Sequence, residues 1–473
     1  MSKEIKKPVD AEATRHEIDE LIAKAKRAQA TIENYSQEQA DALVTAVGWH
    51  VFKNREALAK LAVEEGGFGN YADKVAKFEN RVLGTLTDMA AVRTCGIVEE
   101  LPGKGLVKIA KPVGVVAALI PATGPDATPP VNALAALKAR NAIIVSPHPK
   151  TRKTSAAVVE AMRRGCEQVG APADLIQIIA QPSIAKTEEL MHQADLIVAT
   201  GGAAMVKAAY SSGTPAYGVG VGNSVHVVDE TADLDDAAAM IARAKTFDYA
   251  TSCLADNSVV AHESVYAQLL QRLVKAGGFV CNPQQKAQIC KVMWPDGGHI
   301  PSIDIIAKPA MHIAELAGIS ISADRSFLIV EEDGVGHDHP FSGEKLSVVL
   351  ALYRYSGGID SAIALVNEIT HYQGMGHTCG IHSKNDEHIL ALAMKTKTGR
   401  VMVNQNLNEG AGSPRNGMPY TLSLSCGTWG GNITTENVNV RHFFNLTWVS
   451  RPITPRTVSV DSVFKGHIAK YGD

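Results

Sequence analysis

A single cysteine on a short polar connector has the setting best suited to covalent chemistry. Residues 246–260 read Thr-Phe-Asp-Tyr-Ala-Thr-Ser-Cys-Leu-Ala-Asp-Asn-Ser-Val-Val, with Cys253 at the centre. A helix capped by Asp233 is predicted to end just before this stretch, and a strand is predicted over 258–261. Connectors between regular elements present side chains that a rigid scaffold positions, which suits a nucleophile. The alternative is a small buried hydrophobe, the commoner state of a free cysteine.

A second candidate site lies at a Gly-Gly turn. Thr200, Gly201 and Gly202 follow a predicted strand at 196–199 and precede a predicted helix from about residue 204. Backbone N–H groups at such a helix N-terminus can hold a phosphate. No GxGxxG motif opens a helix after the first predicted strand, so the usual dinucleotide fingerprint is absent. Spacing alone leaves a phosphate site and a plain turn equally open.

The elements that must position these residues form an alternating series. Short apolar strands are predicted at 115–120, 142–145, 175–180 and 196–199, with amphipathic helices between them. This alternation is typical of a parallel, doubly wound sheet, which binds ligands outside the carboxyl ends of its strands. Residues 11–79 are predicted to be scaffold helices, in which the run 73–77 forms a solvated face. Residues from about 102 to 112 are predicted to form a β-hairpin or projecting arm.

Composition excludes several classes of function. The chain has 473 residues and a net charge of -3, so it lacks the basic footprint of a nucleic-acid or lipid-surface protein. Its seven cysteines form no CxxC pair, and we predict neither disulfides nor a metal site. The residues His337-Asp338-His339 are predicted to be an exposed loop. The N-terminal residues are charged and no apolar run is long enough to span a membrane, so we expect a cytoplasmic protein, neither exported nor membrane-embedded.

A set of motifs in fixed order carries a family resemblance. They are residues 115–141, Ser146-Pro147-His148-Pro149-Lys150, Thr200-Gly201-Gly202, Gly218-Val219-Gly220-Val221-Gly222-Asn223, Cys253, Glu344-Lys345-Leu346-Ser347, Gly376-His377-Thr378 and Cys426-Gly427-Thr428-Trp429-Gly430-Gly431-Asn432. In order and spacing the set resembles the CoA-acylating branch of the aldehyde dehydrogenase superfamily. The match as a set is very specific, although each motif alone is not.

The resemblance implies an α/β fold of the aldehyde dehydrogenase type. A Rossmann-type cofactor-binding domain is expected over 1–235, with an oligomerisation arm at about 98–112. An α/β catalytic domain is expected over 236–430, and a C-terminal oligomerisation segment over 431–473. The arm is expected to pair with C-terminal residues of a neighbouring subunit, in a homodimer or homotetramer.

The resemblance also implies roles for individual residues. Cys253 is the expected nucleophile: its thiolate adds to an aldehyde, hydride leaves to a nicotinamide, and a thioester remains on the enzyme. His377 is expected to face the thiol, although a satisfied core histidine remains open. The expected cofactor-binding residues are Ser146, His148, Lys150, Lys153, Thr200, Gly201, Gly202, Gly220 and Glu344. The cations at 150, 152 and 153 favour a 2′-phosphate, so NADP is expected in preference to NAD.

Two departures from related enzymes carry information. Hydrolytic relatives have a Glu, as general base for water, where Gly218 is placed, and losing such a base typically costs 100- to 10,000-fold. Thiolysis by CoA, as co-substrate, is therefore expected to outrun hydrolysis. Gly124 stands where relatives have an Asn that stabilises the oxyanion, a donor worth roughly 3 to 4 kcal/mol. The Cys253 N–H, another donor such as Asn132, or the substrate's own partner group is expected to compensate, and Gly124 is expected to leave space for substrate.

The expected substrate is a short aldehyde with a strong anion, sulfoacetaldehyde first and succinate semialdehyde second. Arg415, on the segment Ser413-Pro414-Arg415-Asn416, is expected to bind the anion through its planar guanidinium, although a solvated loop residue is nearly as well supported. Two alternatives remain: a hydrolytic aldehyde dehydrogenase that needs no CoA, and a catalytically silent nucleotide-binding assembly subunit. The expected partners are the aldehyde, CoA and further copies of the chain, and neither nucleic acid nor a membrane is expected.

Overall fold

The first half of the chain is built on a five-stranded parallel sheet. The computed structural model describes residues 11–298 and 300–472, so the N-terminal residues discussed above lie outside the described part. The strands are β3 (Val115–Leu119), β4 (Ala142–Ser146), β5 (Ile176–Ile178), β6 (Leu196–Ala199) and β7 (Ala216–Gly218), in the order β5-β4-β3-β6-β7. The order reverses at β3, which pairs with both β4 and β6. The predicted doubly wound sheet is confirmed, and its switch point opens a crevice at the carboxyl ends of β3 and β6.

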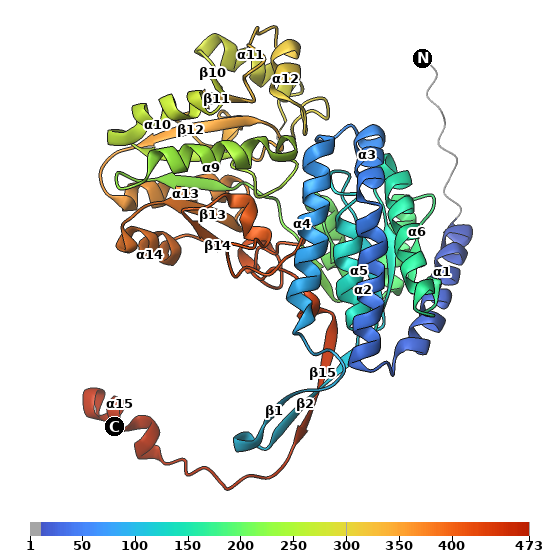
Figure 1. Cartoon of the computed structure of the whole chain (residues 1–473). Helices are drawn as coiled ribbons and strands as arrows, with labels where there is room; N and C mark the ends of the chain where they lie inside the picture. Colours follow the sequence, from blue (N-terminus) through green and yellow to red (C-terminus); the bar gives the residue numbers. More distant parts are fainter. Residues whose placement is uncertain (1–10, 299, 473) are drawn as a thin grey trace.

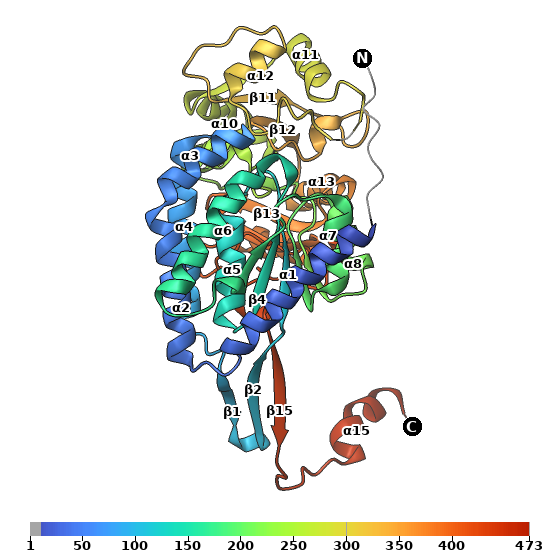
Figure 2. The ribbon, with the colours of Figure 1, turned by 90° about the vertical axis from the view of Figure 1, so that its right-hand side faces the viewer.

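Helices cover this sheet on both faces (Figures 1 and 2). They are α1 (Ala11–Ile32), α2 (Gln37–Lys53), α3 (Arg55–Gly66), α4 (Tyr71–Ala90), α5 (Thr128–Lys138), α6 (Arg152–Gln168), α7 (Ile184–Gln193) and α8 (Ala203–Ser211). The helices predicted over 11–79 are present, and the apolar faces of α1 and α2 are buried, for example at Ile18 and Val47. The run 73–77 on α4 is different, because Lys74 is almost fully buried. The predicted solvated face is therefore wrong.

A second, seven-stranded parallel sheet carries the other half. Its order is β10-β11-β12-β9-β8-β13-β14, with strands β8 (Val225–Val228), β9 (Ser258–His262), β10 (Gly278–Val280), β11 (Phe327–Glu331), β12 (Val349–Tyr355), β13 (Gly376–His382) and β14 (Thr398–Val403). Its helices are α9 (Leu234–Thr246), α10 (Glu263–Lys275), α11 (Pro283–Met293), α12 (Ala310–Leu316), α13 (Ile359–Tyr372) and α14 (Asp386–Lys395). Because β8 pairs with β9 and β13, this sheet begins upstream of residue 235, where the domain boundary is predicted.

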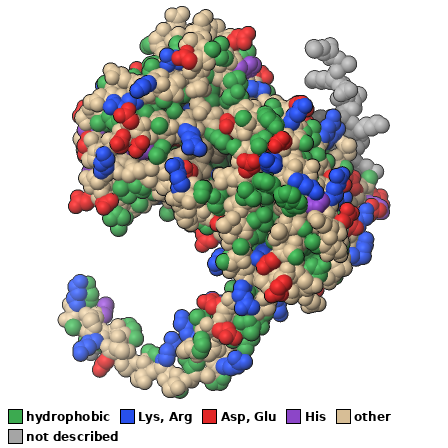
Figure 3. Space-filling model, viewed as in Figure 1, with side chains coloured by type: hydrophobic (Ala, Val, Ile, Leu, Met, Phe, Trp, Pro, Cys, Tyr) green, Lys and Arg blue, Asp and Glu red, His purple; other side chains and the backbone are tan. Residues whose placement is uncertain are grey.

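An arm projects from the body and ends far from it (Figures 1 to 3). Strands β1 (Gly96–Leu101) and β2 (Leu106–Pro112) form the predicted hairpin, and β15 (Phe444–Ser450) adds to β2 antiparallel. The strand β15 that pairs with β2 thus belongs to the same chain, and the expected pairing of the arm with C-terminal residues of a neighbouring subunit stays a prediction. The pairing within the chain has a local reason: Val440 and Phe443 pack into the first core and deliver β15 to the edge of β2.

Beyond the arm the chain continues into α15 (Val460–Tyr471), whose side chains are nearly all exposed. Figure 3 shows this end of the chain as a separate limb. Among the described helices, none is long and apolar enough to cross a membrane.

Candidate active site

A cavity of about 520 Å³ lies between the carboxyl edge of the five-stranded sheet and the amino edge of the seven-stranded sheet. Cys253 reaches it just before β9, and Glu344 reaches it shortly before β12. Two walls flank the thiol. The glycine wall consists of Thr200–Gly202 and Val219–Gly222, and the α4 wall consists of Lys77 and Arg81. The cavity thus brings together most of the residues expected to do chemistry.

The connector that carries Cys253 is strained. After α9 the residues Asp248, Tyr249 and Ala250 have φ values of 48°, 51° and 60°, the left-handed region that residues with a side chain rarely adopt. Each such residue costs roughly 1–2 kcal/mol. Interactions of the connector with other elements must offset this cost, since strain of this kind persists only where the surroundings impose it.

Asp248 supplies those interactions. Its carboxylate accepts from Lys77 Nζ at 2.8 Å, from Lys74 Nζ at 3.2 Å and from the Asn70 backbone N–H at 3.0 Å. Burial alone would raise the pKa of the Asp248 carboxyl, but the two ammonium groups outweigh it and the pKa is lowered. The run 73–77, expected to face solvent, therefore fixes the connector ahead of the nucleophile.

The thiol faces a neutral imidazole. His377 Nε2, on β13, lies 3.2 Å from Cys253 Sγ, so the expectation that His377 faces the thiol is met by the geometry. Burial, followed by the nearby Arg400 charge, lowers the pKa of His377 to about 3. Burial, followed by Glu344, raises the pKa of the Cys253 thiol. Both pKa shifts favour an uncharged thiol and an uncharged imidazole at rest, and the 3.2 Å distance makes His377 Nε2 the ring atom placed to receive the thiol proton.

Arg400 is a buried cation near this pair that the sequence did not reveal. It donates to His377 O at 3.2 Å, to Ser425 O at 2.9 Å and to Thr435 O at 2.8 Å. Its charge opposes the upward shift of the Cys253 pKa. A lone Arg at the start of β14 has no distinguishing local pattern, so only the packing of β13 against β14 identifies it.

The glycine wall fits a dinucleotide. Gly202 is the N-cap of α8 without any side-chain cap, and a Cβ there would meet nothing within 4 Å, so the N–H groups of Ala203 and Ala204 stay open to a ligand. At Gly222 a Cβ would stand 2.4 Å from Cys253 O, so only glycine lets this loop reach the thiol. Glu344 accepts from the Gly222 N–H at 3.1 Å, and burial raises the pKa of Glu344 to about 8. A nicotinamide nucleotide, held by these residues, suits the open donors and the glycine surface.

The side chain that reaches the thiol from this wall is Val219, and not a group at position 218. A Cβ on Gly218 would stand 2.6 Å from Val206 Cγ1 and 2.7 Å from Tyr210 Cε2, away from the cavity. Val219 lines the cavity and packs in the apolar cluster that Cys253 touches. The residue that stands in place of the general base of hydrolytic enzymes is therefore Val219, and the prediction of Gly218 is off by one residue. Glu344 is the only carboxylate among the described residues that line the cavity.

The space beside Gly124 is already filled by a hydroxyl. A Cβ at Gly124 would stand 2.7 Å from Thr128 Oγ1, and Thr128 lines the cavity. The expected extra space for substrate at Gly124 is therefore smaller than predicted. Asn132, considered as a replacement donor, instead lines a separate cavity of about 210 Å³ near Tyr420, so that suggestion is wrong.

The residues expected to hold the adenosine end are only partly brought together. His148 lines the cavity, whereas Ser146 is buried and its hydroxyl lies 2.8 Å from Thr187 Oγ1. Lys150 and Lys153 are exposed beside it. The Glu65 carboxylate accepts from the backbone N–H groups of Lys153 at 2.9 Å and Thr154 at 2.7 Å, so one acid caps the helix that carries the cations.

Arg415 is not among the described residues that line the cavity. Its guanidinium is 57% exposed and pairs with Glu409 Oε1 at 2.5 Å. The expected substrate-binding role of Arg415 is therefore corrected, because the carboxylate of its own loop already neutralises it. The cations that do line the cavity, Lys77 and Arg81, come from α4.

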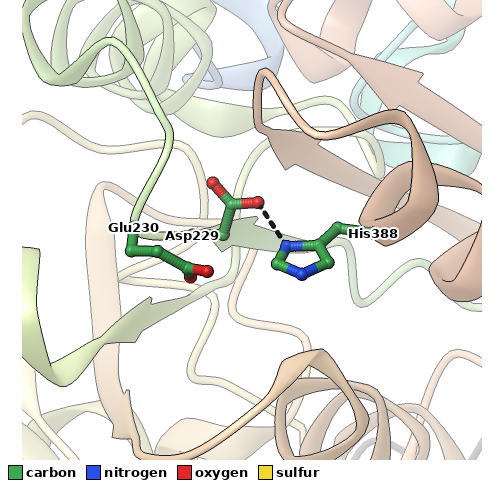
Figure 4. Close-up of side chains that lie close together, drawn as sticks. All are labelled: Asp229, Glu230 and His388. Carbon is green, nitrogen blue, oxygen red and sulfur yellow. Dashed lines mark hydrogen bonds and ion pairs between the residues drawn. The ribbon is translucent and has the colours of Figure 1, made fainter.

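Two acid–histidine clusters lie outside the cavity. In the first, Asp229 accepts from the Thr231 N–H at 2.8 Å and faces His388 Nδ1 at 2.9 Å, while Glu230 points nearby (Figure 4). In the second, Glu332 lies 2.8 Å from His339 Nδ1 and 3.0 Å from Lys286 Nζ. Because protein donors already occupy the buried carboxylates, both clusters are structural contacts.

Comparisons with known proteins agree on one group of enzymes. The profile described as "Aldehyde dehydrogenase family" matches residues 6–279. A "Sulfoacetaldehyde dehydrogenase" of Acholeplasma sp is 46% identical over 453 residues, which are 94% of this chain and 93% of that protein. A "Succinate-semialdehyde dehydrogenase (acetylating)" of Clostridium kluyveri is 42% identical over 91% of this chain and 94% of that protein.

Solved structures give the same result. An acetylating aldehyde dehydrogenase from Geobacillus thermoglucosidasius superposes with a TM-score of 0.91 at 36% identity, covering 96% of this chain and 100% of that one. A propionaldehyde dehydrogenase from Rhodopseudomonas palustris, with bound CoA and an acylated cysteine, has a TM-score of 0.83 at 26% identity, covering 92% of this chain and 97% of that one. An engineered glycolyl-CoA reductase with bound NADP+ has a TM-score of 0.82 at 27% identity, covering 92% of this chain and 96% of that one.

Proposed function

The chain belongs to the aldehyde dehydrogenase family, and from this premise we propose that it is a CoA-acylating aldehyde dehydrogenase that oxidises a small anionic aldehyde, sulfoacetaldehyde first. The observation that carries the proposal is Cys253 between His377 at 3.2 Å and the apolar Val219. Cys253 supplies the nucleophile, and Val219 stands where hydrolytic enzymes have the carboxylate that activates water.

The residues of the chain account for the steps. As Cys253 Sγ bonds to the aldehyde carbon, the neutral His377 ring accepts the thiol proton. When bound at the glycine wall, the nicotinamide supplies the acceptor for the hydride that leaves the hemithioacetal carbon. The sulfur of CoA then attacks the thioester carbon as its thiol proton passes to solvent, and Cys253 leaves as the thiolate, which takes its proton back from the His377 ring. The products are acyl-CoA and the reduced nicotinamide.

Two donors are available for the oxyanion. Within the described residues the Cys253 N–H donates to no other residue, and the Thr128 hydroxyl has no hydrogen-bond partner although it lines the cavity. We propose that these two groups replace the Asn of related enzymes. Thr128 occupies the space beside Gly124, which explains why a glycine there does not leave the site without a donor.

NADP is proposed over NAD because Lys150 and Lys153 flank the adenosine end, although Glu65 supplies one opposing charge. Lys153→Asp should then raise the KM for NADP+ much more than the KM for NAD+. A homodimer or homotetramer built on the arm is proposed from its exposed strands and from α15. The cytoplasmic location stays a prediction.

The deciding experiment is an NAD(P)H-formation assay with and without CoA, with products identified by mass spectrometry. We expect acyl-CoA from sulfoacetaldehyde, with free acid below about a tenth of the product, since the missing base costs water 100-fold or more. Free acid formed as fast as acyl-CoA would support a hydrolytic enzyme instead. Succinate semialdehyde as the better substrate would keep the enzyme class and replace the first-choice substrate.

A further inference from the structure

Helix α4 presents two cations to the cavity, one helical turn apart. Lys77 already has an acid partner, because Asp248 Oδ2 lies 2.8 Å from its Nζ. Arg81 differs. Among the ion pairs of residues 11–298 and 300–472 none contains Arg81, although it is only 7% exposed. A buried guanidinium without an acid partner needs hydrogen-bond acceptors for its charged N–H groups, either from the protein or from a bound anion.

The guanidinium of Arg81 is held in place by neutral groups. It donates to the backbone carbonyls of Ala411, of Gly412 at 3.0 Å and of Asn408 at 3.3 Å. The ring of Tyr420 lies 5.8 Å away and covers one face. Three of the five N–H groups of a guanidinium are used in this way, which leaves donors for a ligand in the cavity.

Arg81 and the nucleophile face the same part of the cavity. Ala411, whose carbonyl accepts from Arg81, packs in the small apolar cluster with Leu254 and Leu424 against which Cys253 lies. Both Arg81 and Cys253 line the cavity. In such apolar surroundings a charge acts over a longer range than in water.

We propose that Arg81 binds the anionic group of the aldehyde while the carbonyl carbon lies at Cys253. The inference rests on the proposed function and names the residue that selects the substrate. A planar guanidinium donates in parallel to two oxygens of a sulfonate or carboxylate, which a lysine cannot do. A short anionic aldehyde is thereby oriented at both ends, whereas a neutral aldehyde of the same size is held only at the thiol.

A purely structural role is the competing explanation, because Arg81 also joins α4 to the segment 407–412. Kinetics on two aldehydes separate the roles. In Arg81→Gln we expect the KM for sulfoacetaldehyde to rise at least 100-fold with kcat nearly unchanged, while kcat/KM for acetaldehyde changes less than threefold. An equal loss on both aldehydes, or no loss on either, would overturn the proposal. Arg81→Lys should recover only part of the selectivity.

Two further experiments keep the test of Arg81 decisive. Arg415→Gln tests the other arginine and should leave the KM for both aldehydes unchanged; a selective rise there would overturn the assignment to Arg81. If Arg81→Gln fails to fold, inhibition of the wild type serves instead: ethanesulfonate should compete with acetaldehyde at least tenfold more strongly than 1-propanol, and equal inhibition would overturn the proposal. Wild-type turnover of acetaldehyde without any preference for anions defeats this inference alone, whereas absence of CoA-dependent turnover on every aldehyde defeats the proposed function.

Discussion

The glycine wall and the α4 wall enclose the same thiol but are built by different means. The glycine wall uses backbone: Gly202 leaves N–H groups open, and Gly222 lets the chain pass within contact of Cys253. The α4 wall uses buried charge, with Lys74 and Lys77 on Asp248 and with Arg81 on backbone carbonyls. We infer that the two walls have different functions. The backbone of the glycine wall holds a nucleotide common to many enzymes, whereas the charged side chains of the α4 wall position the nucleophile and select the aldehyde.

Removing the nucleophile gives the largest effect and should leave both walls intact. Cys253→Ser is expected to lower kcat by at least about 10,000-fold, because a serine hydroxyl is far less ionised than a thiol. The free energy of unfolding and nucleotide binding should stay close to wild type. Cys290→Ser, at a half-buried thiol on α11, is the matched control. Residual turnover above a few per cent in the Cys253 variant would remove this residue from the mechanism.

The charge pairing of the α4 wall can be removed at Asp248, the acid that pairs with Lys74 and Lys77. Asp248→Asn should lower the free energy of unfolding by about 3–5 kcal/mol, because two lysines lose the charge that pairs them in a buried site. Chemical denaturation measures this. Asp360→Asn removes an ion pair whose acid is 73% exposed and should cost less than about 1 kcal/mol.

The same pair predicts a pH dependence. Since the pKa of Asp248 is lowered on folding, its contribution is complete above the unfolded pKa of about 3.9 and is lost as pH falls through the folded value. The stability gap between wild type and Asp248→Asn should therefore shrink below about pH 4. A gap that is constant with pH would show that the ion pairs are not its cause.

The proposed oxyanion donors belong to residues that line the same cavity as the walls. Thr128→Val should lower kcat by about 100-fold with little change in KM, because a hydroxyl donor to the transition state is lost while the volume is kept. Thr128→Ser, which retains the hydroxyl, should keep most of the activity. Equal losses in the two variants would indicate packing and would return the oxyanion to the Cys253 N–H alone.

The glycine wall can be tested with one methyl group. Gly222→Ala places a Cβ 2.4 Å from Cys253 O, so we expect kcat/KM to fall by about 10- to 100-fold and stability by about 1–3 kcal/mol. Gly103→Ala is the control, because a Cβ there meets nothing within 4 Å. Activity within twofold of wild type for Gly222→Ala would show that the loop can move aside.

The smallest expected effect is a gain in the free energy of unfolding, whereas the substitutions above lower stability or activity. Ala250→Gly should raise the free energy of unfolding by about 0.5 kcal/mol, because glycine relieves the strain at a φ of 60° and the loss of a buried methyl offsets only part of this gain. Ala239→Gly, at an exposed position within α9, should instead lower stability by about 1 kcal/mol. Denaturant midpoints of the two variants therefore move in opposite directions.

The two walls also differ in how well sequence predicts them. Thr200–Gly202 could be placed because a strand, a Gly-Gly turn and a helix are local signals. Lys74, Lys77 and Asp248 could not, since nothing in one sequence shows which distant acid a buried lysine meets. The sequence-based prediction places the position of the general base at Gly218, one residue away from Val219, which lines the cavity. Successive side chains of an extended segment point to opposite faces, so an error of one residue moves the predicted side chain out of the cavity.

The arm has a consequence for how the protein is made. Strand β2 needs β15 as its neighbour, yet β15 lies near the C-terminus and emerges from the ribosome after both parallel sheets. During synthesis one edge of the β1–β2 hairpin stays open, and an open edge is a template for pairing with another chain. The arm can therefore be completed only after both sheets have been synthesised, and truncation after residue 443 should leave an exposed, aggregation-prone edge on β2.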